Sequence, residues 1–564
     1  MQFFTGEAGI NTRYTTMYYV SLALLVASLP LSKFTMSVFQ FTTLIFWLWH
    51  GVDTAFLHKY SLQRLLNPAR LLALVAETLV QISIAFAQKL TRFFRNKPAL
   101  IITSLVLLHV IGLLYTTDFG YALKDFRTKL PILILPLFLA TGPRLNTDTF
   151  YRILVLFCAA VVAGSIYRLI QFIYTPVADP RDVEVHTSHI RYSLNAVFAI
   201  FILIFFAFKY QKLSIALRVT AIISATWLAV FMVYMNYTTG VLLLAITGFI
   251  MLIFYTLRIK KTRLKIAALS AIAIAVLLPL LYVFSVSYRY LHTPEVDFAK
   301  LDKYTPAGNS YYHDTLNFKS KNGEWIGLYI CDKELRQAWA QRSKQPIDGL
   351  DKNKQVIRAT LITYLASKGF RKDAGGVDRL SEEDIRNIEN GINRFDYKKI
   401  PGIQSQIEDF IGGYQHYIRN HDPNAGSMIQ RFEYWRTSLL LIRQHPVFGV
   451  GTGDVPQAFD EQYNKMNSNL APQFRLRSHN QYFSITIALG IFGLIWFLVV
   501  MIYPGIITRN FNNYFYVIFW LIMLISMFTE DTIESQEGVT FYAIFTAMML
   551  LGRDQTETNE LLYD

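Results

Sequence analysis

Long apolar runs, separated by short polar segments, dominate the pattern of the chain. A transmembrane helix needs roughly 20 predominantly apolar residues, and runs close to that length recur about twelve times. The predicted spans lie near residues 17–32, 35–50, 98–116, 130–142, 150–173, 191–208, 215–235, 239–257, 265–287, 481–503, 512–529 and 538–552. The pattern therefore predicts an all-α polytopic membrane protein with about 12 transmembrane helices.

Three regions follow from the positions of these runs. Residues 1–287 form an N-terminal transmembrane region of about nine spans, residues 288–480 a large loop domain, and residues 481–564 a C-terminal transmembrane region of about three spans. The stretch 66–88 is apolar but carries Arg70 and a glutamate, which favours an amphipathic helix on the cytoplasmic surface rather than a span.

The first part of the loop domain contains signals for both strands and helices. Asn322-Gly323 supplies the backbone of a two-residue turn between flanks that roughly alternate in polarity, which indicates a β-hairpin over 314–330. Two helical stretches follow, and glycines at 369 and 391 end them. We therefore expect a small α+β domain between two late spans.

Basic loops predict the orientation of the spans. The loops 89–97, 209–212 and 257–265 are rich in lysine and arginine, which places them in the cytoplasm and the alternate loops, including 288–480, on the outer side of the membrane. Residues 117–129 contain Lys124, Arg127 and Lys129 although they fall on the outer side. Either this loop is an ordinary exception, or it is a basic interfacial helix that meets lipid phosphates.

Composition changes this picture little but excludes some functions. The chain has 564 residues, of which 17% are charged, and a formal net charge of +14. Because the basic residues cluster in short loops between apolar runs, the charge indicates topology and not a nucleic-acid partner. The sequence has no P-loop and no GxGxxG pattern, so no nucleotide cofactor is expected. Cys158 and Cys331 lie in very different settings and do not predict a disulfide.

Three polar clusters lie at predicted outer ends of spans. They are residues 186–193, 430–436 and 475–480. Arginines at the ends of spans often extend to lipid phosphates and have no other role. However, ionisable groups at membrane depth are costly, so they tend to be paired and functional. His186 and His189 are an incomplete metal-binding set, because no nearby carboxylates complete it. No metal is expected.

The last cluster is part of a longer motif. His479-Asn480 is followed by nine residues and then by Gly490-Ile-Phe-Gly493. This resembles the H-[N/S/Q]-x9-G-x-x-G signature of the O-antigen ligase family (WaaL-like members of the O-antigen ligase and polymerase Wzy superfamily). The upstream segment 431–454, RFEYWRTSLLLIRQHPVFGVGTGD, looks like the R-x-x-x-W…HP-x-x-G-x-G segment of that family. One departure is that residues 236–240, NYTTG, lack the arginine that the family often carries at this place.

The resemblance implies a glycosyltransferase of lipopolysaccharide biosynthesis in the bacterial inner membrane. Its donor would be a glycan on undecaprenyl diphosphate, and its acceptor a hydroxyl of lipid A–core or a related glycan on the periplasmic face. Such a reaction needs no cofactor and no metal, and it would invert the anomeric carbon. His479 would be the general base. The donor diphosphate would be bound by Arg191, Arg431 and Arg477. His189, Asn480 and Glu433, from the same three clusters, are supporting candidates.

Other functions stay open at this point. An O-antigen polymerase or a protein O-glycan ligase of the same superfamily would carry the same motif. A transporter of lipid-linked sugars is a different class, and it predicts charges at mid-span and two related halves, whereas here the charges concentrate at span ends. A sensor whose loop domain binds a partner is a further alternative, and it would leave the motif unexplained.

Overall fold

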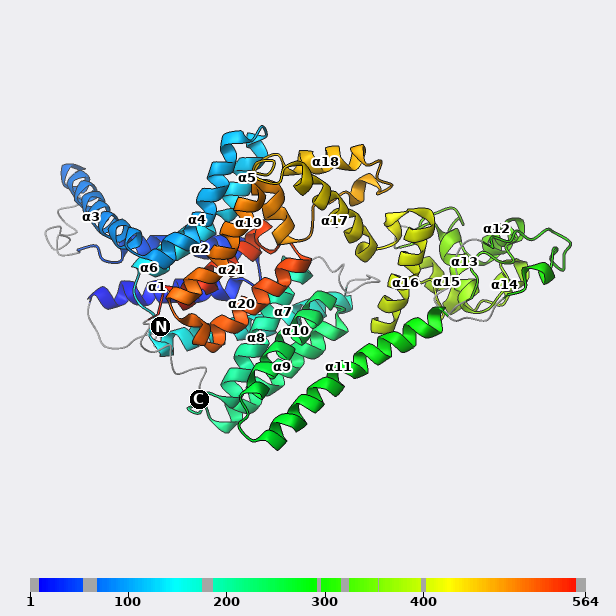
Figure 1. Ribbon diagram of the computed structural model, residues 1–564, viewed down its shortest axis with the longest axis horizontal. Coiled ribbons are helices and arrows are strands. Elements are labelled where there is room, and N and C mark those ends of the chain that lie inside the picture. Colours follow the sequence, from blue (N-terminus) through cyan, green and yellow to red (C-terminus); the bar gives the residue numbers. More distant parts are fainter. Residues whose placement is uncertain are drawn as a thin grey trace.

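The computed structural model describes residues 10–53, 68–174, 186–291, 296–315, 324–352, 355–396 and 402–553. Within these ranges the fold is all-α (Figure 1). Eight helical segments are long and apolar enough to cross a membrane. They are α3 (Pro68–Phe94), α4 with the 3-10 turn that follows it (Lys97–Tyr115), α7 (Thr147–Tyr174), α8 (His189–Phe208), α9 (Ile215–Tyr234), α10 (Thr238–Leu257), α11 (Thr262–Leu291) and α19 (Gln481–Ile507).

All the spans predicted from the sequence fall on helices, but five of these helices are not among the eight segments that meet both the length and the hydropathy needed for a span. They are α1 (Ile10–Ser28), α2 (Lys33–Trp49), α6 (Pro131–Thr141), α20 (Tyr514–Thr529) and α21 (Gln536–Leu550). In contrast, α3 covers the stretch that was predicted to lie on the cytoplasmic surface, and its length and hydropathy also suffice for a span. The multi-span architecture is therefore confirmed, and eight segments qualify as candidate spans among the residues that the structure describes.

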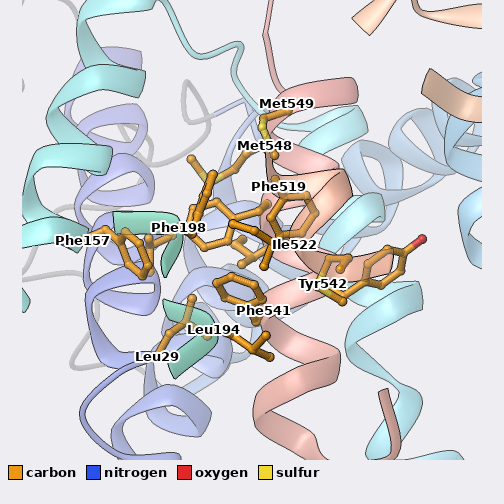
Figure 2. Close-up of a cluster of buried hydrophobic side chains, with 14 of the residues drawn as sticks. Leu29, Phe157, Leu194, Phe198, Phe519, Ile522, Phe541, Tyr542, Met548 and Met549 are labelled. Carbon is orange, nitrogen blue, oxygen red and sulfur yellow. The ribbon is translucent and has the colours of Figure 1, made fainter. Parts of the chain in front are cut away.

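The centre of the bundle is a cluster of aromatic side chains from distant parts of the chain (Figure 2). The ring of Phe198 on α8 lies 4.9 Å from that of Phe545 on α21 and 5.5 Å from that of Phe519 on α20. Phe157 on α7 packs on Phe545 at 5.1 Å. The side chains of α21 are buried almost all around, which is typical of a helix enclosed by others. The core thus joins the N-terminal and C-terminal transmembrane regions.

The loop domain is helical, so the prediction of an α+β domain is wrong for the described residues. Its helices α12 (Asp332–Arg342), α13 (Ile357–Ser367), α14 (Ala374–Asp378) and α15 (Glu382–Glu389) enclose a separate core around Trp339 and Leu361. This domain lies at one end of the molecule, beyond α11 and α16 (Gly402–Asn420), as Figure 1 shows.

The predicted hairpin is reduced to a single bridge. Tyr312 and Ile330 exchange both backbone hydrogen bonds, at 2.7 and 3.0 Å. The adjacent Tyr329 has a positive φ of 57°, which is incompatible with extended backbone, and beyond it Asp314 N donates to Gly327 O at 2.8 Å. The predicted turn at Asn322-Gly323 lies outside the described residues.

The long helix α19 is broken at Gly490, whose φ of 67° and ψ of −166° are not helical. Such a break leaves backbone carbonyls without their partners in the helix. The segment that follows α17 (Ser427–Gln444) supplies new partners: Val450 donates to Ile487 at 2.8 Å and Gly451 to Ala488 at 3.0 Å.

The same segment also satisfies the donor on the other side of the break. The backbone N–H of Ile491 donates to the carbonyl of Pro446 at 2.9 Å. A Cβ atom at Gly490 would lie 2.0 Å from the carbonyl oxygen of Val447, and one at Gly449 would lie 2.5 Å from backbone atoms of α19. The two glycine-containing motifs of the sequence are therefore complementary halves of one backbone joint.

We expect Gly490→Ala to destabilise the protein strongly, because alanine would be strained at this φ and would overlap the 446–448 backbone. The left-handed conformation alone costs on the order of 1–3 kcal/mol for a residue other than glycine. Gly248→Ala in α10 is the matched control, since its nearest neighbour, Phe201, would be 3.9 Å from the new Cβ. Thermal unfolding in detergent measures both variants, and equal melting temperatures would contradict the role of the joint.

Candidate active site

The predicted polar clusters converge on the short connection between α20 and α21. This connection contains Glu530, Asp531 and the 3-10 turn Thr532–Glu534. The end of α20 and the beginnings of α8, α10, α19 and α21 lie on one side of the bundle, because helices joined by short loops alternate in direction. We call this side of the bundle the site side.

His479 lies at the start of α19 and faces the α20–α21 connection. Its Nδ1 is 3.5 Å from Oε2 of Glu530. Its ring stacks on that of Tyr434 from α17, with 5.5 Å between ring centres. The next residue, Asn480, caps α19 by accepting a hydrogen bond from Phe483 N at 3.1 Å. With 29% of its side chain exposed, His479 is held in place and still accessible.

Arg431 meets the same carboxylate from another direction. Its Nη2 donates to Oε1 of Glu530 at 2.7 Å, and its Nη1 donates to the backbone carbonyl of Thr529. Each oxygen of Glu530 thus faces a different side chain, one the imidazole of His479 and the other the guanidinium of Arg431. The side chain of Glu530 is only 5% exposed, so this contact brings α17 and α19 together over a buried negative charge.

Arg191, near the start of α8, completes this group. Its Nη2 donates to the backbone carbonyl of Asp531 at 2.8 Å. Its Nη1 is buried and has no hydrogen-bond partner among the residues that the structure describes. An unpaired buried donor is costly, so an acceptor at this nitrogen would be favourable.

The surrounding charges keep Glu530 ionised. Burial alone would raise the pKa of this carboxyl group. The hydrogen bond with His479 and the positive charges of Arg431 and Arg191 outweigh burial and hold the pKa of Glu530 below its ordinary value. The site therefore contains a carboxylate at neutral pH, and this carboxylate neutralises part of the positive charge around it.

Arg477 lies in a different contact network from His479. Its Nη1 donates to the hydroxyl of Tyr121 at 2.7 Å and lies 3.8 Å from Glu534. Glu534 also pairs with Lys129 at 2.9 Å. Residues two apart in an extended strand point to the same side, but His479 has a positive φ of 46°, and the chain turns between the two side chains.

The network around Arg477 is a second buried polar group. Lys129 pairs with Asp125 at 2.5 Å as well as with Glu534. Burial alone would lower the pKa of Lys129, but these two carboxylates raise it to about 12. A cavity of about 20 Å³ lies among these side chains and that of His109, which is room for about one water molecule. Of the three basic residues in the loop 117–129, Lys129 therefore pairs with carboxylates inside the protein.

Two predicted supporting residues, Glu433 and His189, have other contacts. Glu433 accepts a hydrogen bond from Ser468 at 2.8 Å and lies on the face of α17 that points away from Arg431. The ring of His189 packs on Tyr237, with 5.7 Å between centres. Within the described ranges, no group of three or more His, Cys, Asp or Glu side chains is placed to hold a metal ion.

The structure adds Arg168, which the sequence analysis did not single out. This arginine lies within the apolar run of α7, and its guanidinium is buried against Tyr237 at 3.4 Å and the carbonyl of Thr187 at 2.7 Å. It also lies 4.4 Å from the ring centre of Tyr192. A guanidinium is thus present beside residues 236–240, the place where the related family often has an arginine in sequence.

Glu530 and Asp531 were also missed as site residues. In the sequence, residues 529–538 form an acidic loop, which indicates only the side of the membrane on which they lie. The signal that could have identified them is an acidic loop on the same predicted side as three arginine-containing clusters. Asp531 fixes the loop, since its Oδ1 accepts from Ser484 at 2.9 Å and from Ser478 at 3.2 Å.

Taken together, these features define a multi-span membrane protein with a histidine, two arginines and a carboxylate gathered on one side of its helical bundle. Residues 390–498 match the family model Wzy_C, described as O-Antigen ligase. Over this segment the chain is similar to the O-antigen ligase family, as the motifs predicted. A search of the curated proteins gives no match.

The matched segment contains only part of the site. Arg431, Arg477 and His479 lie inside it, whereas Arg191 and Glu530 lie outside. The fold therefore brings residues of α8 and of the α20–α21 connection next to the site residues of the matched segment.

We expect Glu530→Gln to lower thermal stability at pH 7, because it removes the charge that compensates Arg431 and Arg191. Losing a hydrogen bond to a charged group costs about 1–3 kcal/mol. Since the pKa of Glu530 is depressed in the folded protein, its contribution to stability is present above the ordinary carboxyl pKa of about 4.3. This contribution disappears as the pH falls through the lowered value.

The difference in melting temperature between wild type and Glu530→Gln should therefore stay constant from pH 7 to about pH 5 and shrink as the pH falls below about 4.3. Differential scanning fluorimetry in detergent measures it. Glu461→Gln, at an exposed position of α18 (Val455–Lys465), is the control and should have little effect. A difference that stays constant as the pH falls well below about 4.3 would show that the charge of Glu530 is not what stabilises the site.

Proposed function

We propose that this protein transfers a glycan from undecaprenyl diphosphate to a hydroxyl of lipid A–core, or of a related glycan, on the periplasmic face of the inner membrane. The observation that carries the proposal is the meeting of His479, Arg431 and Arg191 around residues 529–531. One side chain of this group can take a proton, and two can bind phosphate oxygens.

The arginines are suited to the donor. Guanidinium groups bind phosphate oxygens through parallel hydrogen bonds and stay charged. Arg431 already binds two oxygens, one from Glu530 and one from a backbone carbonyl, so its fork is oriented for a similar pair of oxygens on a diphosphate. The unpartnered Nη1 of Arg191 offers a further donor. Preorganised charges of this kind stabilise a leaving group as it becomes more negative.

His479 is suited to activate the acceptor. Glu530 faces Nδ1, which favours the tautomer with the proton on Nδ1 and leaves Nε2 free to accept one. In the proposed step the acceptor hydroxyl gives its proton to Nε2 while its oxygen bonds to the anomeric carbon. The bond from that carbon to the diphosphate breaks, and the lipid diphosphate leaves. A single displacement inverts the anomeric carbon, and Glu530 stabilises the imidazolium that forms.

The loops support a periplasmic location of the site. The basic loop 257–265 joins α10 to α11 on the side of the bundle opposite the site side. Lysine and arginine in short loops favour the cytoplasm, so the site side would face the periplasm. An enzyme on that face has no access to cytosolic nucleotide sugars, and a lipid diphosphate donor carries its own leaving group.

We expect His479→Ala to reduce glycan transfer about 10²–10⁴-fold, which is the usual contribution of a general base. Transfer from a purified lipid-linked donor in liposomes measures the effect. His421→Ala, at an exposed position before α17, is the matched control and should transfer at the normal rate. Near-normal transfer by His479→Ala, with correct insertion, would reject the proposed base.

Arg431→Lys and Arg191→Lys keep the charge and lose the planar fork. We expect each to raise the KM for the donor and to lower kcat, together about 10-fold or more in kcat/KM, corresponding to about 1.4 kcal/mol. Arg436→Lys on the same helix α17, with 59% of its side chain exposed, should be neutral. Full activity in both site variants would argue against diphosphate binding by these arginines.

A further inference from the structure

Three aromatic side chains of α16 and α17 form an exposed cluster close to the site. Phe410 and Tyr414 of α16 stack at 6.2 Å between ring centres, with 15° between ring planes. Phe432 of α17 lies 6.5 Å from Phe410 and 6.3 Å from Tyr414. All three rings contact one another and are still partly exposed.

Two aliphatic side chains extend this cluster in both directions. Ile418 follows Tyr414 by one helical turn, and Met428 precedes Phe432 by one turn. The five side chains are 36% to 59% exposed. We call these residues, Phe410, Tyr414, Ile418, Met428 and Phe432, the aromatic patch. An exposed apolar patch of this kind marks an interaction site more often than a single exposed side chain does.

The aromatic patch is continuous with the proposed phosphate-binding group. Met428 lies three residues before Arg431 and four residues before Phe432 on α17. Residues three and four apart are neighbours on a helix surface, so Met428 lies between the cation and the rings. An apolar surface thus begins next to the guanidinium that faces Glu530.

The aromatic patch also lies at the level where spans end. Gln406 of α16 accepts a hydrogen bond from Thr238, at the start of α10, at 3.2 Å. A Cβ at Gly412 would be 2.9 Å from the hydroxyl oxygen of Tyr290, near the end of α11. Because α10 starts and α11 ends on the site side, α16 rests against the ends of two candidate spans (Figure 1).

We propose that the aromatic patch binds the part of the donor's polyprenyl chain that is nearest to its diphosphate. This inference rests on the proposed function, because it takes the diphosphate to lie at Arg431. A molecule with two phosphates at one end and an unsaturated hydrocarbon chain at the other needs cations next to an apolar surface at the bilayer boundary. Arg431, Met428 and Phe432 supply this sequence of chemistry in one turn of α17.

The test compares two ligands that share the diphosphate and differ in the chain. Phe432→Ala, Phe410→Ala and Met428→Gln are made in the full-length protein in lipid nanodiscs. Undecaprenyl diphosphate and chainless methyl diphosphate are titrated against each variant. We expect about a 10-fold loss of affinity for undecaprenyl diphosphate and no change for methyl diphosphate. Tyr304→Ala in the loop domain removes an aromatic ring that is 64% exposed but distant in the fold, and it should change neither affinity.

Four results would overturn the inference. Affinity for both ligands could fall alike, which would mean that the aromatic patch only supports Arg431. Both affinities could stay unchanged, which would mean that the patch contacts only bilayer lipid. The variants could alter only the KM of the acceptor in the transfer assay, which would assign the patch to the acceptor. Finally, wild-type protein could fail to bind undecaprenyl diphosphate.

The transfer assay separates this inference from the proposed function. Chain-dependent binding that needs the aromatic patch, without glycan transfer to any acceptor tested, would support the inference and reject the proposed reaction. Normal glycan transfer, together with undecaprenyl diphosphate binding that does not depend on the aromatic patch, would support the proposed reaction and reject the inference.

Discussion

The site depends on one buried carboxylate that is shared by two positively polarised groups. Glu530 has one oxygen toward His479 and the other toward Arg431, and Arg191 binds the backbone next to it. A buried carboxylate is costly without such partners. The arginines would in turn repel one another if Glu530 were absent. These contacts therefore fix the positions of α8, α17, α19 and α20 relative to one another. They also determine the net charge of the site.

Much of this arrangement could be predicted from the sequence, since apolar runs and the charges at their ends depend on local composition. His479, Arg431 and Arg191 were placed on one side by the alternation of spans alone, and the structure brings them around one loop. The direction of Arg477 could not be predicted in this way, because it depends on the positive φ of His479. Glu530 was overlooked for a similar reason: an acidic loop gives no sign of the side chains that it will meet.

The loop domain shows a different limit of sequence patterns. Alternating polarity and Asn-Gly predicted a hairpin over 314–330, whereas the described residues contain a single bridge between Tyr312 and Ile330, next to Tyr329 with its positive φ. The family segment begins at residue 390, so the domain around Trp339 precedes it in the chain and has its own core. Its helices and the site are connected through α16, the helix that also carries most of the aromatic patch.

The break in α19 gives the distance between His479 and Gly490 a geometric meaning. The joint with residues 446–451 fixes the helix at Gly490, and Glu530 fixes the imidazole at the other end. Between them lie two and a half helical turns, about 3.6 residues each. One inserted residue would rotate the start of the helix by about 100° and turn the imidazole away from the carboxylate. The length of the nine-residue interval therefore determines the direction of the imidazole. Substitution of side chains within the interval should disturb the site far less than insertion or deletion of a residue.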